Sequence, residues 1–181
     1  MELMFDLETL DTTPDAVVLS VGAVVFHQGG DACIIDRLYR VLDIQAQIDA
    51  GRTISQSTLL WWMEQSEVAR DAAFIDDRAP PALVSLALNH FSEKYGISRF
   101  WAGPSTFDFP IWDSLAQDCH FRAPWTYRQT RDLRTIVDES GISIDAEDEK
   151  WSGSDEVPHH PVYDCERQIN LLAAARNALR R

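Results

Sequence analysis

Hydrophobic and polar positions alternate with a period of two at the start of the chain, which predicts a β-strand that ends near Glu8. Because strand side chains point alternately to opposite faces, Phe5 and Leu7 share one face, and Met4, Asp6 and Glu8 share the other. The pattern therefore predicts two carboxylates side by side at the end of an otherwise apolar strand.

Two further strands are predicted directly after the first. Residues 17–26 are rich in valine, and residues 33–42 form a similar segment. Residues 11–15 have the residue types of a turn, and Gly29-Gly30 closes a second, hairpin-like turn. Strands joined by such turns form an antiparallel meander.

From Ile44 onward the pattern is helical. Residues 57–63 form the start of a short helix, and residues 67–73 either continue it or form a second helix. The first of these segments contains Trp61-Trp62, and because adjacent helical side chains point about 100° apart, we expect at least one of the two indoles in the core. Pro80-Pro81 opens a clearer helix. This helix ends at Gly96. Its apolar stripe consists of Val84, Ala87, Leu88, Phe91 and Tyr95.

The rest of the chain alternates strands and helices. Residues 99–102 form a fourth strand, and residues 125–127 are the candidate fifth. Helices are predicted after Asp108, over residues 131–139 and from Pro161 onward. Because parallel neighbours need crossover connections, the strands near residues 100 and 126 should run parallel to the first strand. We therefore expect an α/β fold with a mixed five-stranded sheet flanked by helices, and with the first strand in a central position.

Residues 141–157 are polar and rich in acidic side chains: Asp145, Glu147, Asp148 and Glu149. A solvated loop is the usual form of such a segment. A mobile flap beside the site is the less favoured alternative.

Composition limits the classes of function. A chain of 181 residues with 45% hydrophobic residues fits a single domain, residues 1–181, with a sizeable core. The formal net charge of −13 argues against broad nonspecific binding of nucleic acid, although bound cations would reverse the sign locally. No segment has the pattern of a secretory signal or a membrane span, so no membrane partner is expected. Cys33, Cys119 and Cys165 are far apart and suit a reducing cytoplasm.

The chemistry is indicated by four acidic residues and one histidine: Asp6, Glu8, Asp108, Asp164 and His159. Two carboxylates on one buried strand face repel each other, and a divalent cation such as Mg²⁺ is the usual solution. Each residue alone also has an ordinary explanation, namely a solvated edge strand, a helix cap, a complement to a helix dipole or a loop histidine. Their occurrence together, in this order and on these elements, is much less common.

Three motifs resemble those of the DEDDh (DnaQ-like) 3′–5′ exonuclease superfamily, which has an RNase H-like fold. They are Asp6-x-Glu8, Phe107-Asp108 and His159-x-Pro161-x-x-Asp164. The segments 58–62 and 131–135 are similar to a narrower branch of phage DexA-like exonucleases and actinobacterial 3′–5′ exoribonucleases. The third motif commonly has Ala where this chain has Pro161, a residue that is tolerated at the first position of a helix.

The resemblance implies a metal-dependent 3′–5′ exonuclease with two Mg²⁺ or Mn²⁺ ions. Asp6 would bridge the ions, Glu8 and Asp164 would complete the site of the ion that holds the attacking water, and Asp108 would help to hold the second ion. His159 would be the general base.

The resemblance also implies contacts with the substrate, a single-stranded DNA or RNA 3′ end. Thr9 would lie near the 3′-hydroxyl and Leu10 against the last base. Basic side chains along the path of the strand are candidates for further contacts, with a solvated surface role more common for each: Arg122, Arg128, Arg131 and Arg134.

Two other interpretations remain. A haloacid-dehalogenase-like phosphatase also begins with an acid-x-acid motif, but position 8 is Glu and the only lysines are Lys94 and Lys150. A non-catalytic nucleic-acid-binding or interaction protein on an exonuclease scaffold is the second. The sequence does not choose DNA over RNA and does not fix the oligomeric state, for which a homodimer is one option.

Overall fold

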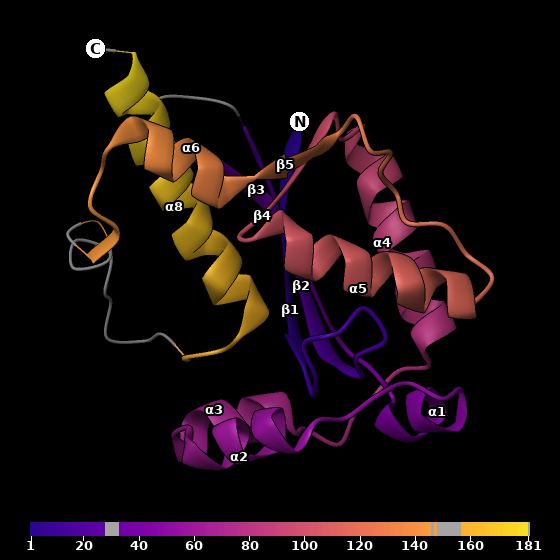
Figure 1. Cartoon of the computed structure of the whole chain (residues 1–181). Coiled ribbons are helices and arrows are strands. Elements are labelled where there is room, and N and C mark those ends of the chain that lie inside the picture. Colours follow the sequence, from indigo (N-terminus) through magenta and orange to yellow (C-terminus); the bar gives the residue numbers. More distant parts are fainter. Residues whose placement is uncertain (28–32, 146, 148–156, 181) are drawn as a thin grey trace.

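A five-stranded mixed sheet forms the centre of the fold (Figure 1). The computed structural model describes residues 1–27, 33–145, 147 and 157–180. The strand order is β3-β2-β1-β4-β5, so β1 (Glu2–Thr9) has a neighbour on both sides. The predicted central position of the first strand is confirmed.

The first three strands form the predicted antiparallel meander. β1 pairs with β2 (Val18–His27), and β2 pairs with β3 (Cys33–Val41). β4 (Arg99–Ala102) then lies parallel to β1, and β5 (Thr130–Asp132) lies parallel to β4. The predicted turn at Gly29-Gly30 lies outside the described residues, as does much of the acidic segment 141–157.

The fifth strand was wrongly placed by sequence. It comprises Thr130–Asp132 rather than residues 125–127. The aromatic residues of 125–127 have other positions: the Trp125 ring packs against Phe5 and Phe100 in the core, whereas Tyr127 is 81% exposed. The aromatic residues of 125–127 therefore reflect the burial of the Trp125 indole in the core and do not indicate a β-strand.

The helix that was predicted over residues 131–139 begins two residues later. α6 runs over Leu133–Ser140 because Asp132 is its N-cap, with a side chain that accepts a hydrogen bond from the Thr135 N–H. Arg131 belongs to β5 instead.

Helices cover both faces of the sheet and one of its ends (Figure 1). α4 (Pro81–Tyr95) and α5 (Ser105–Asp118) lie on one face. α6 and α8 (Pro161–Leu179) lie on the other. The short helices at the end of the sheet are α1 (Ile44–Asp49), α2 (Gln56–Glu64) and α3 (Glu67–Ala73). None of the helices in the described part of the chain is long and apolar enough to span a membrane.

The alternation along β1 separates two hydrophobic cores. Phe5 and Leu7 pack in the core that contains Trp112 of α5, and Met4 packs with Cys165 of α8 on the opposite face. Asp6 and Glu8 consequently point toward the α8 face, as the period of two predicts.

Glu2, at the other end of β1, fixes the direction of α8. Its buried carboxylate accepts hydrogen bonds from Trp101 Nε1 at 2.7 Å and from the Arg176 guanidinium at 2.6 Å. The helix from Arg176 back to Asp164 spans roughly 18 Å at 1.5 Å per residue, and β1 from Glu2 to Glu8 spans about 20 Å. The first turn of α8 therefore reaches the end of β1 that carries Asp6 and Glu8.

Candidate active site

Four acidic side chains from three elements converge at the end of β1. Asp6 and Glu8 come from β1, Asp108 from the first turn of α5, and Asp164 from the first turn of α8. All four line one cavity of about 660 Å³, together with His159. The structure thus brings together the four predicted acids and the predicted histidine, although up to 158 positions separate them in sequence.

Burial raises the pKa of three of these carboxyl groups, those of Asp6, Glu8 and Asp108, and repulsion between neighbouring carboxylates adds to the effect at Asp6 and Glu8. Burial is the main cause that raises the pKa of Asp6 well above its usual value, and the charges of Asp108, Asp164 and Glu8 add to it. Burial likewise raises the pKa of Glu8, with smaller contributions from Asp164 and Asp108. Hard divalent cations prefer such carboxylate oxygens, so the set of donors fits Mg²⁺ or Mn²⁺.

Asp108 is held against β1 by a backbone contact. The Leu7 N–H donates to its Oδ1 at 3.1 Å, and only 2% of Asp108 is exposed. Burial raises the pKa of Asp108 to about 8, although the Leu7 N–H and the positive charge of Arg134 favour the carboxylate. This acid is therefore the most enclosed member of the cluster and has little freedom to move.

Gly22 allows α8 to approach the sheet at the cluster. It lies opposite Asp6 in the β1–β2 ladder. A Cβ at this position would lie 2.4 Å from the carbonyl carbon of Pro161 and 2.7 Å from the Val162 nitrogen. Only glycine leaves room for the backbone at the start of α8, which presents Asp164.

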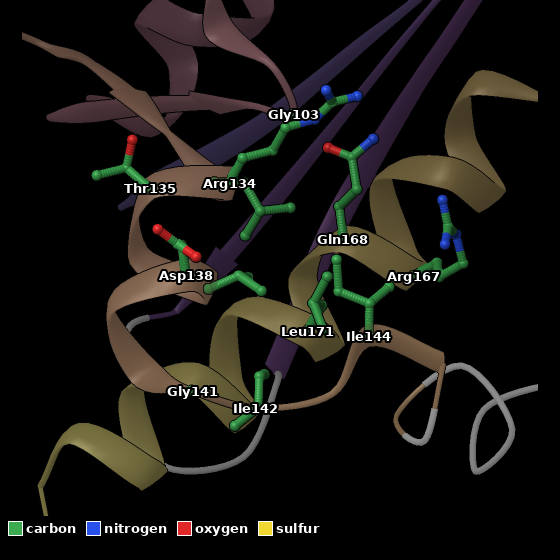
Figure 2. A pocket seen from close by; sticks show the side chains of 12 residues that line it. Gly103, Arg134, Thr135, Asp138, Gly141, Ile142, Ile144, Arg167, Gln168 and Leu171 are labelled. Atoms are coloured by element: carbon green, nitrogen blue, oxygen red, sulfur yellow. The ribbon is translucent and has the colours of Figure 1, made fainter.

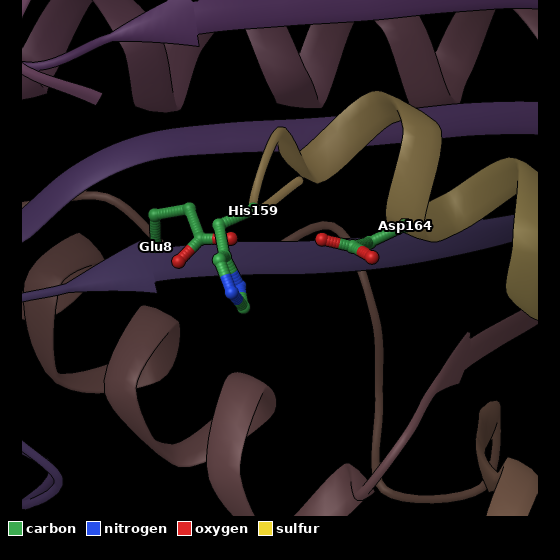
Figure 3. A group of neighbouring side chains, drawn as sticks. All are labelled: Glu8, His159 and Asp164. Carbon is green, nitrogen blue, oxygen red and sulfur yellow. The ribbon is translucent and has the colours of Figure 1, made fainter. Parts of the chain in front are cut away.

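His159 faces the cavity from the residues just before α8 (Figure 3). One ring nitrogen and one carboxylate oxygen each from Glu8 and Asp164 all lie within 4.8 Å of one another. The His159 backbone is in the left-handed region, with φ at 58°. Because such a conformation is uncommon for a residue with a side chain, it is a mark of a constrained position.

His160 points elsewhere. Its ring packs against Tyr39 and Tyr163, at centroid distances of 4.3 and 4.9 Å, and burial lowers its pKa. The two adjacent histidines therefore have different surroundings.

The tryptophan pair divides between the cavity and the core. Trp62 is 2% exposed and donates through Nε1 to the Thr9 carbonyl at 2.9 Å, which confirms the prediction that at least one indole is buried. Trp61 lines the cavity, and its ring meets that of His159 edge to face at 4.7 Å. Trp61 thus forms a wall beside His159.

The two residues predicted to touch the nucleotide lie in different places. Thr9 lines the cavity, and its hydroxyl donates to the Asp11 carbonyl at 2.7 Å, which leaves its lone pairs open to a donor. Leu10 is 3% exposed and packs in a hydrophobic cluster with Val17 and Trp62. A contact between Leu10 and a base stays a prediction, although a side chain that is 3% exposed offers little surface to a ligand.

Only one of the four candidate arginines lines the cavity, namely Arg134. Arg122 borders two hollows elsewhere, and the Arg128 guanidinium lies over the Tyr127 ring. Arg131 donates to the carbonyls of Arg128 and Thr130.

Two residues of α8 that line the cavity were not predicted from the sequence. Arg167 lies one turn after Asp164, with its Nε 3.7 Å from Asp164 Oδ1. Gln168 is buried and donates through Nε2 to Asp6 Oδ1 at 2.8 Å. Residues three and four positions after Asp164 lie on the same face of a helix, so this spacing could have indicated both residues from the sequence.

Comparisons with known proteins identify the family and the fold of the chain. The family described as "3′-5′ exoribonuclease Rv2179c-like domain" matches residues 1–175. A solved structure described as "Exonuclease X in complex with 5′ overhanging duplex DNA" is similar in fold, with a TM-score of 0.61. The likeness covers 98% of this chain and 92% of that chain at 17% identity, so it shows the fold alone. No curated protein sequence matches this chain significantly. The similarity to phage exonucleases stays a prediction.

Proposed function

Because the chain belongs to the Rv2179c-like 3′-5′ exoribonuclease domain family, we propose that it removes nucleotides from the 3′ end of single-stranded RNA in a divalent-metal-dependent reaction. Membership makes the chain a 3′–5′ exonuclease, a hydrolase of phosphodiester bonds, and confirms the superfamily indicated by the motifs. RNA is proposed over DNA on the description of the family. The proposal takes residues 1–181 as one exonuclease domain.

The convergence of four carboxylates and His159 in one cavity is the observation that carries the proposal. Asp6, Glu8, Asp108 and Asp164 would hold two Mg²⁺ or Mn²⁺ ions in this cavity. When bound, the ions supply Lewis-acid polarisation of the attacking water and of the phosphate oxygens.

The protein side chains orient the reactants and move one proton. His159 accepts a proton from the water whose oxygen attacks the phosphorus of the last phosphodiester. The bond from phosphorus to the 3′-oxygen of the preceding nucleotide breaks, that oxygen takes up a proton from solvent, and His159 later releases its proton to solvent. The products are a nucleoside 5′-monophosphate and an RNA shortened by one nucleotide.

The hydroxyl groups at the far end of the cavity suit the terminal ribose. Thr9, Thr12, Ser57 and Thr58 line the cavity together with Trp61, and α2, which carries Ser57, Thr58 and Trp61, is joined to Thr9 by the Trp62 hydrogen bond. Hydroxyl groups donate and accept, so they match the 2′- and 3′-hydroxyls of a ribonucleotide, and Trp61 offers an aromatic face or edge to its base.

Digestion of end-labelled strands tests the proposal. RNA and DNA of one sequence, labelled at either end, are incubated with Mg²⁺, Mn²⁺ or EDTA. We expect release of mononucleotides from the 3′ end of RNA with metal and none with EDTA, with Asp6→Asn inactive and the exposed Asp71→Asn fully active. Cutting of a circular strand would contradict exonuclease action, and intact substrate would favour a non-catalytic binding protein.

Two further properties belong to the proposal. The separated free cysteines suit a reducing compartment such as the cytoplasm. A homodimer stays a prediction, which light scattering of the purified chain tests.

A further inference from the structure

A second cavity adjoins the one that holds the four acids. This α6–α8 groove has a volume of about 770 Å³ and runs between helices α6 and α8 (Figure 2). Gly103, Arg134, Arg167 and Gln168 line both cavities. The two hollows are therefore neighbours that meet at these four residues, and a ligand can extend from one into the other.

The shared wall and the groove differ in chemistry. Arg134 and Arg167 bring two guanidinium groups to the shared wall, in a chain whose net charge is −13. The groove itself is largely aliphatic, with side chains that include Val137, Ile142 and Leu171. Asp138, on α6, adds one exposed carboxylate. Cations at the entrance and an apolar interior suit a phosphate joined to a flat aromatic ring whose face is apolar and whose edge is polar.

The polarity of the bound strand follows from the two ends of the acidic cavity. The hydroxyl-rich end with Thr9 and Trp61 is the proposed place of the terminal nucleotide. The acids connect this end to the shared wall, because His159, which contacts Trp61, lies beside Glu8, whereas Gln168 and Arg167 of the shared wall contact Asp6 and Asp164. A strand that crosses the acids leaves through this wall into the groove.

We propose that the α6–α8 groove binds the penultimate nucleotide of the substrate, the one just upstream of the scissile phosphate. Its base packs against the aliphatic side chains, with Asp138 as an acceptor for an exocyclic amino group, and Arg134 and Arg167 contact the phosphates on either side. This inference rests on the proposed function. A base held between two helices cannot also be paired, so the substrate needs at least two unpaired nucleotides at its 3′ end.

A substitution that fills the groove tests the inference by kinetics. Ile144 lines the groove and is 45% exposed, so Ile144→Trp adds bulk there without removing a core side chain. We expect KM for a pentauridylate RNA to rise at least tenfold. Hydrolysis of uridine 5′-p-nitrophenyl phosphate, which has no upstream nucleotide, should change less than twofold. Leu83→Trp, on α4 and 59% exposed, is the matched control and should leave both substrates unaffected.

Photocrosslinking gives a second measurement that does not depend on turnover. An oligouridine with 5-iodouridine at the last, penultimate or third position from the 3′ end is bound to His159→Ala, which slows cleavage. We expect only the penultimate label to attach to peptides that contain residues 133–144 or 167–171.

The outcomes separate the inference from the proposed function. Wild type that hydrolyses neither substrate refutes the proposed function. Wild type that hydrolyses both, with Ile144→Trp affecting both equally or neither, overturns the groove as a subsite. Labelling of the groove by the terminal nucleotide, or by none, also overturns it.

Discussion

At the scale of single residues, the adjacent histidines His159 and His160 differ in what they contact. His159 faces the acidic cavity, whereas the His160 ring packs against tyrosines. His159→Ala should lower kcat roughly 10²–10⁴-fold, the usual contribution of a general base. The increase in melting temperature that Mg²⁺ causes should be nearly unchanged, because the histidine is not a metal ligand in this scheme. Single-turnover kinetics and thermal melts measure the two effects.

His160→Ala is the matched control for that substitution. It removes ring contacts with Tyr39 and Tyr163, so it should lower stability with little effect on kcat. Because a His159 nitrogen lies within 4.8 Å of oxygens of Glu8 and Asp164, a ligand role is the alternative. Loss of the Mg²⁺-induced shift in His159→Ala would establish that alternative.

Gln168 positions Asp6 and contributes no reactive group of its own. Its Nε2–H donates to Asp6 Oδ1 at 2.8 Å. Gln168→Met keeps the shape of the side chain and removes this donor, so metal affinity should fall about 10–100-fold, as is usual when the partner of a ligand is lost. Titration of Mn²⁺ by calorimetry measures it, with the exposed Gln117→Met as control. Unchanged affinity together with lower stability would mean that Gln168 only fills space.

At the scale of elements, the contact between β2 and α8 determines whether the cluster assembles. Gly22→Ala would place a Cβ 2.5 Å from the Pro161 carbonyl oxygen, so the first turn of α8 must move away from Asp6. We expect a loss of roughly 1–3 kcal/mol in the free energy of unfolding, typical of overpacking, and a drop in kcat of at least tenfold. Urea unfolding and steady-state kinetics measure these changes.

Gly96→Ala is the control for that loss of stability. Gly96 ends α4 with φ at 57°, and a Cβ there would have no atom within 4 Å. The strained backbone should lower stability by about 1 kcal/mol with full activity. Equal losses of activity in the two variants would show that stability, and not the position of α8, limits the reaction.

At the scale of the whole molecule, the acidic cluster links folding to pH. Burial raises the pKa of Asp108 to about 8 and those of Asp6 and Glu8 well above their usual values. An unfolded chain loses these protons near pH 4. Between about pH 4 and 8 the folded state therefore binds more protons than the unfolded state, and the free energy of unfolding falls as pH rises.

This linkage predicts how metal-free and metal-bound protein differ. In EDTA, the free energy of unfolding should fall as pH rises across that range. Each extra proton on the folded state accounts for a fall of up to about 1.4 kcal/mol per pH unit. Mg²⁺ should stabilise more strongly at pH 8 than at pH 5, because metal binding displaces protons. Urea unfolding from pH 5 to 8.5 tests this, and a slope in Asp6→Asn equal to that of wild type would contradict it.

The sequence by itself determined the features that depend on local periodicity. The alternation along β1 placed Asp6 and Glu8 on one face, the two early turns gave the meander, and the first turn of α8 placed Asp164 near His159. These follow because the direction of a side chain in a strand or helix is set by the backbone of that element alone.

Only the tertiary structure decided the features that depend on how elements pack. The need for glycine at position 22 became evident only from the backbone of Pro161 packed against it, and the partner of Gln168 only from α8 lying beside β1. The Leu10 side chain packs in a hydrophobic cluster, and Trp125 lies in the hydrophobic core and not in a β-strand. In each case a contact between residues far apart in the chain determined the outcome, and local patterns of polarity do not encode such contacts.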